Sequence, residues 1–211
     1  MNDMERRSSA YYQRRHRERL RDKGLVKKEL WVLPEFADEL GAVEKRMRQP
    51  RGAAPGRGRV ESSMNDGKVW TSAGLYDALS QAEEFVYGDS VIELIDGAQA
   101  SLHLVMAEYG DLPLFLAVVG EQIVVEALLW PVSHVRDPAA FNEEVLRTHK
   151  VIFPLSTIGI ETLADGEDAY MMFGSLSASS SLSNVLYEIE TLADNVIKAT
   201  EAYEMQLLEA A

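Results

Sequence analysis

Cysteine is absent from the 211-residue sequence. Its absence excludes disulfides, thiolate metal sites and thiol nucleophiles, and it is typical of a reducing compartment. Long apolar runs are absent as well, since the longest, residues 112–119, is far shorter than the roughly 20 residues that span a bilayer. The Arg-rich N-terminus is not followed by the apolar segment of a secretory signal. We therefore expect a soluble cytoplasmic protein without membrane insertion.

Signatures of catalysis and ligand binding are also scarce. The four histidines share no metal-ligand spacing, and the acidic residues at 165–168 fall in an expected hairpin turn rather than a calcium loop. The serines at 175–183 contain no Gly-x-Ser-x-Gly sequence, and residues 57–59 lack the Lys-Ser/Thr of a phosphate-binding loop. The sequence thus predicts no catalytic residue, no metal and no cofactor, and we do not expect an enzyme.

Charge, by contrast, is abundant and unevenly distributed. Residues 1–60 hold 16 of the 21 basic and 9 of the 34 acidic residues, a net charge of +7, which leaves –20 for residues 61–211. A basic arm attracts nucleic acid and anionic surfaces, whereas an acidic body repels them. The arm could equally fold back onto the acidic body, and this alternative stays open.

Proline and glycine mark the boundary between arm and body. Residues 49–59 contain two prolines and three glycines and have no apolar periodicity, which is typical of a flexible linker. We therefore expect a basic arm at 1–48, a linker at 49–66 and an acidic body at 67–211. Within the arm, the pattern predicts a helix over 9–23 that ends at Gly24, a strand over 26–33 and a short helix over 36–47.

The body has the pattern of an α+β fold. Turn residues and apolar periodicity predict an antiparallel sheet with helices packed on it. Helices are expected over 72–85, 138–149 and 183–208, and strands over 90–95, 100–108, 112–119, 122–130, 157–163 and 169–175.

The last of these helices carries an apolar stripe at spacings of three and four. Its expected length of about 39 Å, at 1.5 Å per residue, exceeds that of a strand, so its end should overhang the sheet. We expect a protein interface, and with it a homodimer, at Leu192, Val196, Tyr203 and Leu207. The alternative is that the whole stripe packs within its own subunit.

The arm resembles the start of MazE-like antitoxins through residues 12–25, which are Arg-rich and end in Gly-Leu, and residues 29–32, Glu-Leu-Trp-Val. The resemblance implies strands that pair across a dimer and place outward side chains in the major groove of DNA. The nucleic-acid contacts it implies are Arg14, Arg15, Arg17, Arg19, Arg21, Lys27 and Trp31. A full ribbon-helix-helix has a second helix where this sequence has the linker.

The body resembles the bacterial YjfI-like family. The residues that carry the resemblance are Trp-Thr-Ser at 70–72, Leu-Leu-Trp-Pro at 128–131 and the segments 149–156 and 170–177. The element order also resembles type III secretion chaperones and YbjN-like folds, which are noncatalytic protein binders. The YjfI-like resemblance further implies a link to a PspA-type membrane-stress system.

Two functions are compatible with these observations. The first is a noncatalytic adaptor or chaperone-like module that binds a protein partner, such as a PspA-type coiled coil. The second is a DNA-binding regulator that uses the basic arm and dimerises through the body.

Overall fold

The computed structural model describes residues 8–28, 33, 40, 43–44, 46–48, 69–88, 90–97 and 99–208. Half of the strand expected at 26–33, including Trp31, lies outside these residues, as does the whole expected linker. Residues 26–28 and 33 are described and belong to no strand. The described residues of the helix expected at 36–47 are helical.

The arm begins with helix α1 (Ser9–Asp22), close to the expected bounds. Gly24 ends it in a left-handed conformation with φ +76°. The Gly24 amide donates to the Arg21 carbonyl at 2.8 Å, and the Leu25 amide donates to the Leu20 carbonyl at 2.9 Å. This pair of bonds is the Schellman arrangement, which satisfies carbonyls that a helix end would otherwise leave open.

The body contains a six-stranded sheet in the order β1-β2-β3-β4-β6-β5, and every neighbouring pair is antiparallel. The α+β class and the meander predicted from the turn residues are confirmed. The strands are β1 (Val91–Ile95), β2 (Ser101–Met106), β3 (Leu112–Val119), β4 (Gln122–Pro131), β5 (Thr157–Thr162) and β6 (Asp168–Ser177).

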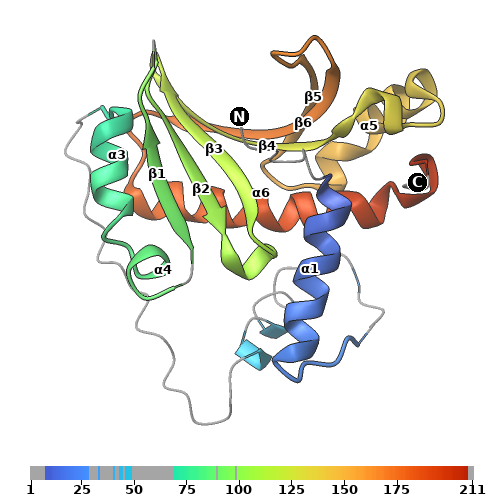
Figure 1. The fold of residues 1–211 in the computed structure, drawn as a ribbon, viewed down its shortest axis with the longest axis horizontal. Helices are drawn as coiled ribbons and strands as arrows, with labels where there is room; N and C mark the ends of the chain where they lie inside the picture. The colour runs from blue at the N-terminus through green and yellow to red at the C-terminus, as the bar shows by residue number, and fades with distance from the viewer. Residues whose placement is uncertain are drawn as a thin grey trace.

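Helices cover one face of this sheet. They are α3 (Ser72–Leu79), α4 (Glu83–Val86), α5 (Pro138–Ile152) and α6 (Leu182–Ala202). The long helix α6 crosses the sheet from side to side, and α1 lies against α6 (Figure 1). The core lies between α3, α6 and the inward side chains of β2, β3, β4 and β6.

The single helix expected over 72–85 is wrong, because the structure divides it into α3 and α4. Thr71 caps α3 by accepting a hydrogen bond from the Gly74 amide at 3.1 Å. At the other end, the Ser80 hydroxyl donates to the Tyr76 carbonyl at 2.7 Å, and Ala82 is extended with ψ 149°. Such a local hydrogen bond competes with the helical pattern, and the chain restarts as α4 after Ala82.

The expected overhang of the C-terminal helix is also wrong. Helix α6 ends at Ala202, and a short 3-10 turn, η4 (Glu204–Gln206), follows. Leu207 then forms an antiparallel bridge with Val135, and the Leu208 amide donates to the His134 carbonyl at 2.9 Å. The end of the described chain therefore folds back onto the segment that follows β4.

Candidate functional site

Helix α1 packs directly on the acidic body through one buried stripe of its surface. The Ser9 hydroxyl lies 2.7 Å from the Thr200 hydroxyl, and both residues are buried. One turn later, the Gln13 amide donates to the Ile197 carbonyl at 3.3 Å. Thr200 and Ile197 both belong to α6, so these bonds fix the first half of α1 across that helix.

The second half of α1 is held by the turn η2 (Ala107–Tyr109), which follows β2. His16 Nδ1 donates to the Glu108 carbonyl at 2.6 Å, and its ring stacks on Tyr109 with centroids 5.7 Å apart. Burial lowers the pKa of His16, although the hydrogen bond to Glu108 opposes that change. The imidazole is therefore neutral at pH 7 and acts as a packing and hydrogen-bonding group.

Gly110 is the point of closest approach between α1 and the body. It has φ +78°, and a Cβ placed on it would lie 2.6 Å from the Tyr12 carbonyl oxygen and 2.9 Å from the His16 amide nitrogen. Both neighbours are backbone atoms of α1, which cannot yield without moving the helix. Only glycine fits the turn and the contact together.

Two of the expected nucleic-acid contacts are paired with the body. Arg15 and Arg19 both form ion pairs with Asp111, and the Arg19–Asp111 distance is 2.7 Å. All three side chains are about one-third exposed. A phosphate that bound Arg15 or Arg19 would have to compete with Asp111 for the guanidinium groups.

The other arginines of α1 face the C-terminal end of α6. Arg17 and Lys27 pair with Glu201 at 3.5 and 3.1 Å. Arg14 and Arg21 are exposed, and within the described part of the chain neither forms an ion pair. The alternative left open by the charge distribution, that the arm folds back onto the body, is what the structure shows for α1.

The apolar stripe of α6 requires a correction. Leu192 and Val196 are fully buried, Tyr203 is 1% exposed, and Leu207 is partly buried against the core. Tyr203 packs edge-on against Phe141 at 5.0 Å. Because the protomer itself buries these side chains, they do not form the surface expected for a partner, and the stripe packs within its own subunit.

The face of the sheet opposite α6 is open, and its side chains are largely apolar. One row crosses five strands through the register partners Glu93, His103, Phe115, Glu126 and Phe173. Apolar side chains flank this row. Those with more than a third of their surface exposed are Val91, Ile95, Phe115 and Val119. We call this surface, made of the outward side chains of β1–β6, the open sheet face.

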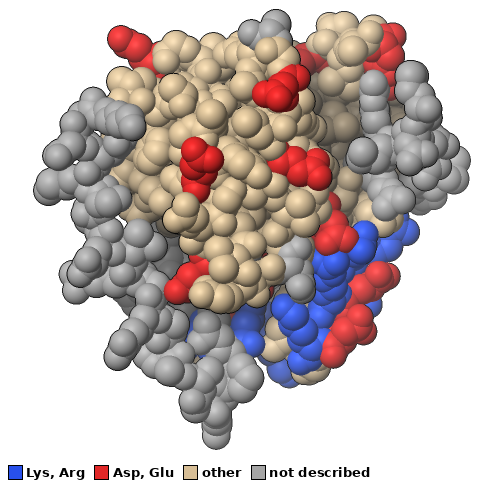
Figure 2. All heavy atoms as spheres, turned by 60° about the vertical axis from the view of Figure 1, so that its left-hand side comes forward, with Lys and Arg blue, Asp and Glu red and all other residues tan. Residues whose placement is uncertain are grey.

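The open sheet face has charge of only one sign. None of the six strands contains a Lys or Arg, whereas Glu93, Glu126 and Glu161 lie on this face. Burial and the nearby Glu161 raise the pKa of Glu126. In Figure 2, which turns the α3 and β1 side forward, uncharged surface with scattered acidic groups dominates, and the basic side chains gather on α1.

No metal-binding cluster is found in the described residues. They contain no group of three or more His, Cys, Asp or Glu side chains placed to hold a metal ion. Among the helices that the structure describes, none is long and apolar enough to cross a membrane.

The continuous apolar run of β3 is the feature of the sequence that could have indicated the open sheet face. A strand covered on one face alternates apolar and polar residues, but β3 reads Leu-Pro-Leu-Phe-Leu-Ala-Val-Val. Such a run is typical of a strand buried on both faces. In this structure, helices cover only one of them.

The body matches the profile of a bacterial family described as "Uncharacterized protein conserved in bacteria (DUF2170)" over residues 69–207. The uncharacterized protein YjfI of Escherichia coli strain K12 is 36% identical over 110 residues, which cover 52% of this chain and 81% of YjfI. YjfI of strain O157:H7 gives the same values. The YjfI-like resemblance of the body is confirmed, and the MazE-like resemblance of the arm stays a prediction.

Two solved structures have a related arrangement of elements. An uncharacterized protein from Methanothermobacter thermautotrophicus is 7% identical with a TM-score of 0.44, over 64% of this chain and 99% of that one. YbjN from E. coli is 16% identical with a TM-score of 0.42, over 63% of this chain and 94% of that one. Similarity at this level carries no functional argument.

Proposed function

We propose that this chain, which belongs to the DUF2170 family of bacterial proteins whose profile covers the whole sheet, is a noncatalytic adaptor that binds a protein partner through the open sheet face. The observation that carries the proposal is the combination of exposed Val91, Ile95, Phe115 and Val119 on one uncovered face. Apolar surface gathered on one face of a fold commonly marks an interaction site.

The charge of the open sheet face defines the partner's chemistry. Glu93, Glu126 and Glu161 border the apolar side chains, and no strand supplies a basic residue. A complementary partner therefore presents apolar side chains flanked by Lys or Arg. An amphipathic helix of a PspA-type coiled coil, the partner that the family resemblance implies, is the segment we propose.

A second copy of this chain is a poor occupant for the same surface. Face-to-face packing would bring the glutamates of two protomers together without a compensating cation, and like-charge contacts of this kind are unfavourable. A homodimer, as expected from the sequence, would have to use another surface.

Calorimetric titration of purified PspA-type coiled coil into the full chain tests the proposal. Phe115→Lys should weaken binding at least about tenfold, because it removes an apolar anchor and adds a charge that repels a basic partner. Val151→Lys is the matched control, since Val151 on α5 is 86% exposed and lies away from the sheet. Equal affinities for the two variants, or no binding by the unmodified chain, would contradict the proposed partner.

The second candidate function is a DNA-binding regulator, and the exposed Arg14 and Arg21 favour it. Phosphate binding by these residues predicts an affinity that falls steeply with salt and a slope that flattens in the Arg14→Ala, Arg21→Ala double variant. Gel-shift titration with duplex DNA measures both. Absence of binding at about 50 mM salt, where nonspecific contacts are strong, would contradict this function.

A further inference from the structure

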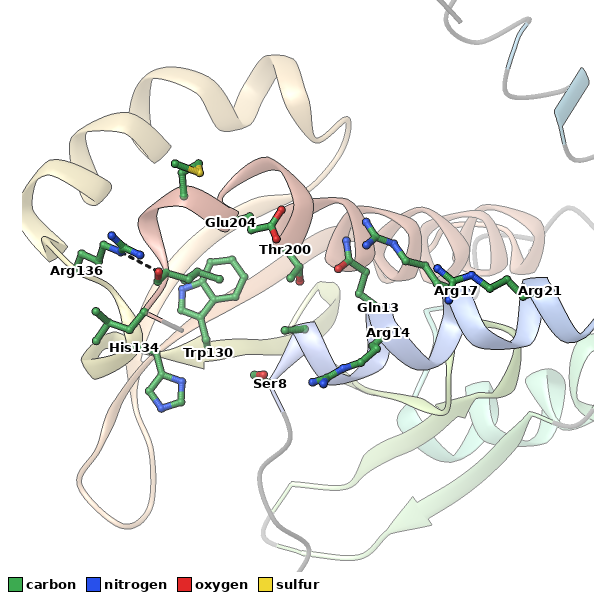
Figure 3. A pocket seen from close by; sticks show the side chains of 14 residues that line it. Ser8, Gln13, Arg14, Arg17, Arg21, Trp130, His134, Arg136, Thr200 and Glu204 are labelled. Carbon is green, nitrogen blue, oxygen red and sulfur yellow. Dashed lines mark hydrogen bonds between the residues drawn. The ribbon is translucent and has the colours of Figure 1, made fainter. Parts of the chain in front are cut away.

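A cavity of about 950 Å³ lies between α1, the C-terminal end of α6 and the segment after β4. Part of its wall is apolar, with side chains that include Trp130, Met205, Leu207 and Leu208. In Figure 3, Trp130 lies at one end of the cavity with Arg136 and His134 beside it. The cavity thus combines an apolar wall with cationic and hydrogen-bonding groups.

The indole N–H of Trp130 is a buried hydrogen-bond donor without an acceptor among the described residues. The side chain is 1% exposed, and its Nε1 is buried with no acceptor. Trp70 shows the ordinary arrangement, because its Nε1 donates to the Ser180 carbonyl at 2.7 Å. Buried N–H groups in folded proteins are nearly always paired. The Trp130 Nε1 has almost no accessible surface, so an acceptor in the cavity reaches it only when the side chains around the indole move aside.

Positive charge gathers at this cavity although the body is acidic. Residues 61–211 contain five basic residues, and one of them, Arg136, lines the cavity. Helix α1 adds Arg14, Arg17 and Arg21. Arg17 is paired with Glu201, so its charge is already compensated. Glu204 is the acidic side chain of the lining, and the three other arginines outnumber it. The net field favours an anion.

A backbone hydrogen bond fixes the position of the Arg136 guanidinium at the cavity. Its Nε donates to the Leu207 carbonyl at 3.0 Å, which ties the guanidinium to the chain end beyond α6. Its two terminal nitrogens form no hydrogen bond within the described residues, and a planar guanidinium presents two parallel donors to a carboxylate.

We propose that this cavity binds a small amphipathic carboxylate. The carboxylate pairs with Arg136, and Arg14 adds charge from the α1 side. Binding moves the side chains around the indole, so that the buried Trp130 Nε1 gains the carboxylate as its acceptor. The apolar part of the ligand packs against Met205, Leu207 and Leu208. A phosphate monoester fits less well, because its second charge would face Glu204 and its headgroup would gain nothing from the apolar wall.

The test follows the indole N–H signals of the ¹⁵N-labelled full chain, which has three tryptophans, during titration with sodium octanoate. Trp130→Phe assigns the signal by its loss. Should that variant fail to fold, Trp31→Phe and Trp70→Phe assign the other two signals, and the Trp130 signal is the one that remains. The Trp130 signal should move saturably, whereas the Trp70 signal should stay in place because that N–H already has an acceptor.

Two variants of the chain and two control ligands test whether octanoate binds through its carboxylate at Arg136. Arg136→Gln should weaken octanoate binding at least about tenfold, and Arg147→Gln, at a 72% exposed position on α5, should leave it unchanged. Octanamide and inorganic phosphate should leave the Trp130 signal unmoved. No saturable movement at millimolar octanoate, equal responses to octanamide or phosphate, or equal affinities for the two variants would each overturn the proposal.

Discussion

Gly110→Ala is the substitution that most sharply tests the docking of α1 on the body. An alanine at φ +78° adopts the left-handed conformation, which costs about 1–2 kcal/mol. Its Cβ also meets the Tyr12 carbonyl oxygen at 2.6 Å and the His16 amide nitrogen at 2.9 Å. Since both contacts are with helix backbone, α1 must move away from the turn.

The cost of that movement follows from the contacts it breaks. Apart from the ion pairs of its arginines, α1 is joined to the body by three side-chain hydrogen bonds, from Ser9, Gln13 and His16, each with a net contribution of about 1 kcal/mol. The ion pairs of Arg15 and Arg19 with Asp111 are partly exposed and add at most about 1 kcal/mol each. Undocking should therefore remove about 3 kcal/mol beyond the conformational cost.

Gly120→Ala is the matched control. Gly120 has φ +61°, and a Cβ there would meet nothing within 4 Å, so it carries the conformational cost alone. Urea unfolding of both full-length variants, combined with hydrogen exchange, measures the difference. We expect Gly110→Ala to lose about 3 kcal/mol more than Gly120→Ala and to lose amide protection throughout α1. Equal losses, with α1 still protected, would refute the reasoning.

Two further substitutions test the interior. Burial raises the pKa of Glu188, whose Oε1 has no hydrogen-bond partner, so its carboxylate destabilises the fold above the ordinary glutamate pKa of about 4.3. Glu188→Gln should raise the urea concentration at the unfolding midpoint at pH 8. This gain should shrink as the pH falls toward the ordinary glutamate pKa, and a gain that does not depend on pH would contradict the prediction. Val196→Asp should cost about 3–5 kcal/mol because it buries an unpaired charge, whereas Tyr187→Asp, at a position 60% exposed on the same helix, should be nearly neutral in thermal melts. If Val196→Asp left the melting point unchanged and changed the oligomeric mass, the result would support the protein interface expected on α6 and contradict its burial within the protomer.

The local elements of this fold could be predicted because their signals are local. Gly120 and Glu121 set a two-residue hairpin between β3 and β4, and both strand bounds at that turn are as expected. Asp137 caps α5 by accepting from the Ala140 amide at 3.1 Å, with Pro138 at the first helical position. Turn and cap residues act within a few positions of themselves, so their pattern can be interpreted without a tertiary structure.

The errors concern residues whose role depends on distant partners. Gly110 can be recognised in the sequence as a turn residue, but its contact with Tyr12 and His16 of α1 joins segments more than ninety positions apart. Tyr203 was predicted to lie on a helix surface, but it ends that helix and packs on Phe141 of α5. The side of the molecule on which Phe115 emerges depends on which face of the sheet the helices cover. Periodicity alone does not give that face.

Site-specific photo-crosslinking in living cells tests the central claim most directly. A photoreactive residue at position 115, in the open sheet face, is compared with one at position 151, on the far side of α5. We predict a discrete adduct from position 115 whose crosslinked peptide, identified by mass spectrometry, is an apolar segment flanked by Lys or Arg, and no such adduct from position 151. The absence of an adduct at 115, the same adduct from both positions, or an adduct that nuclease removes would contradict the account.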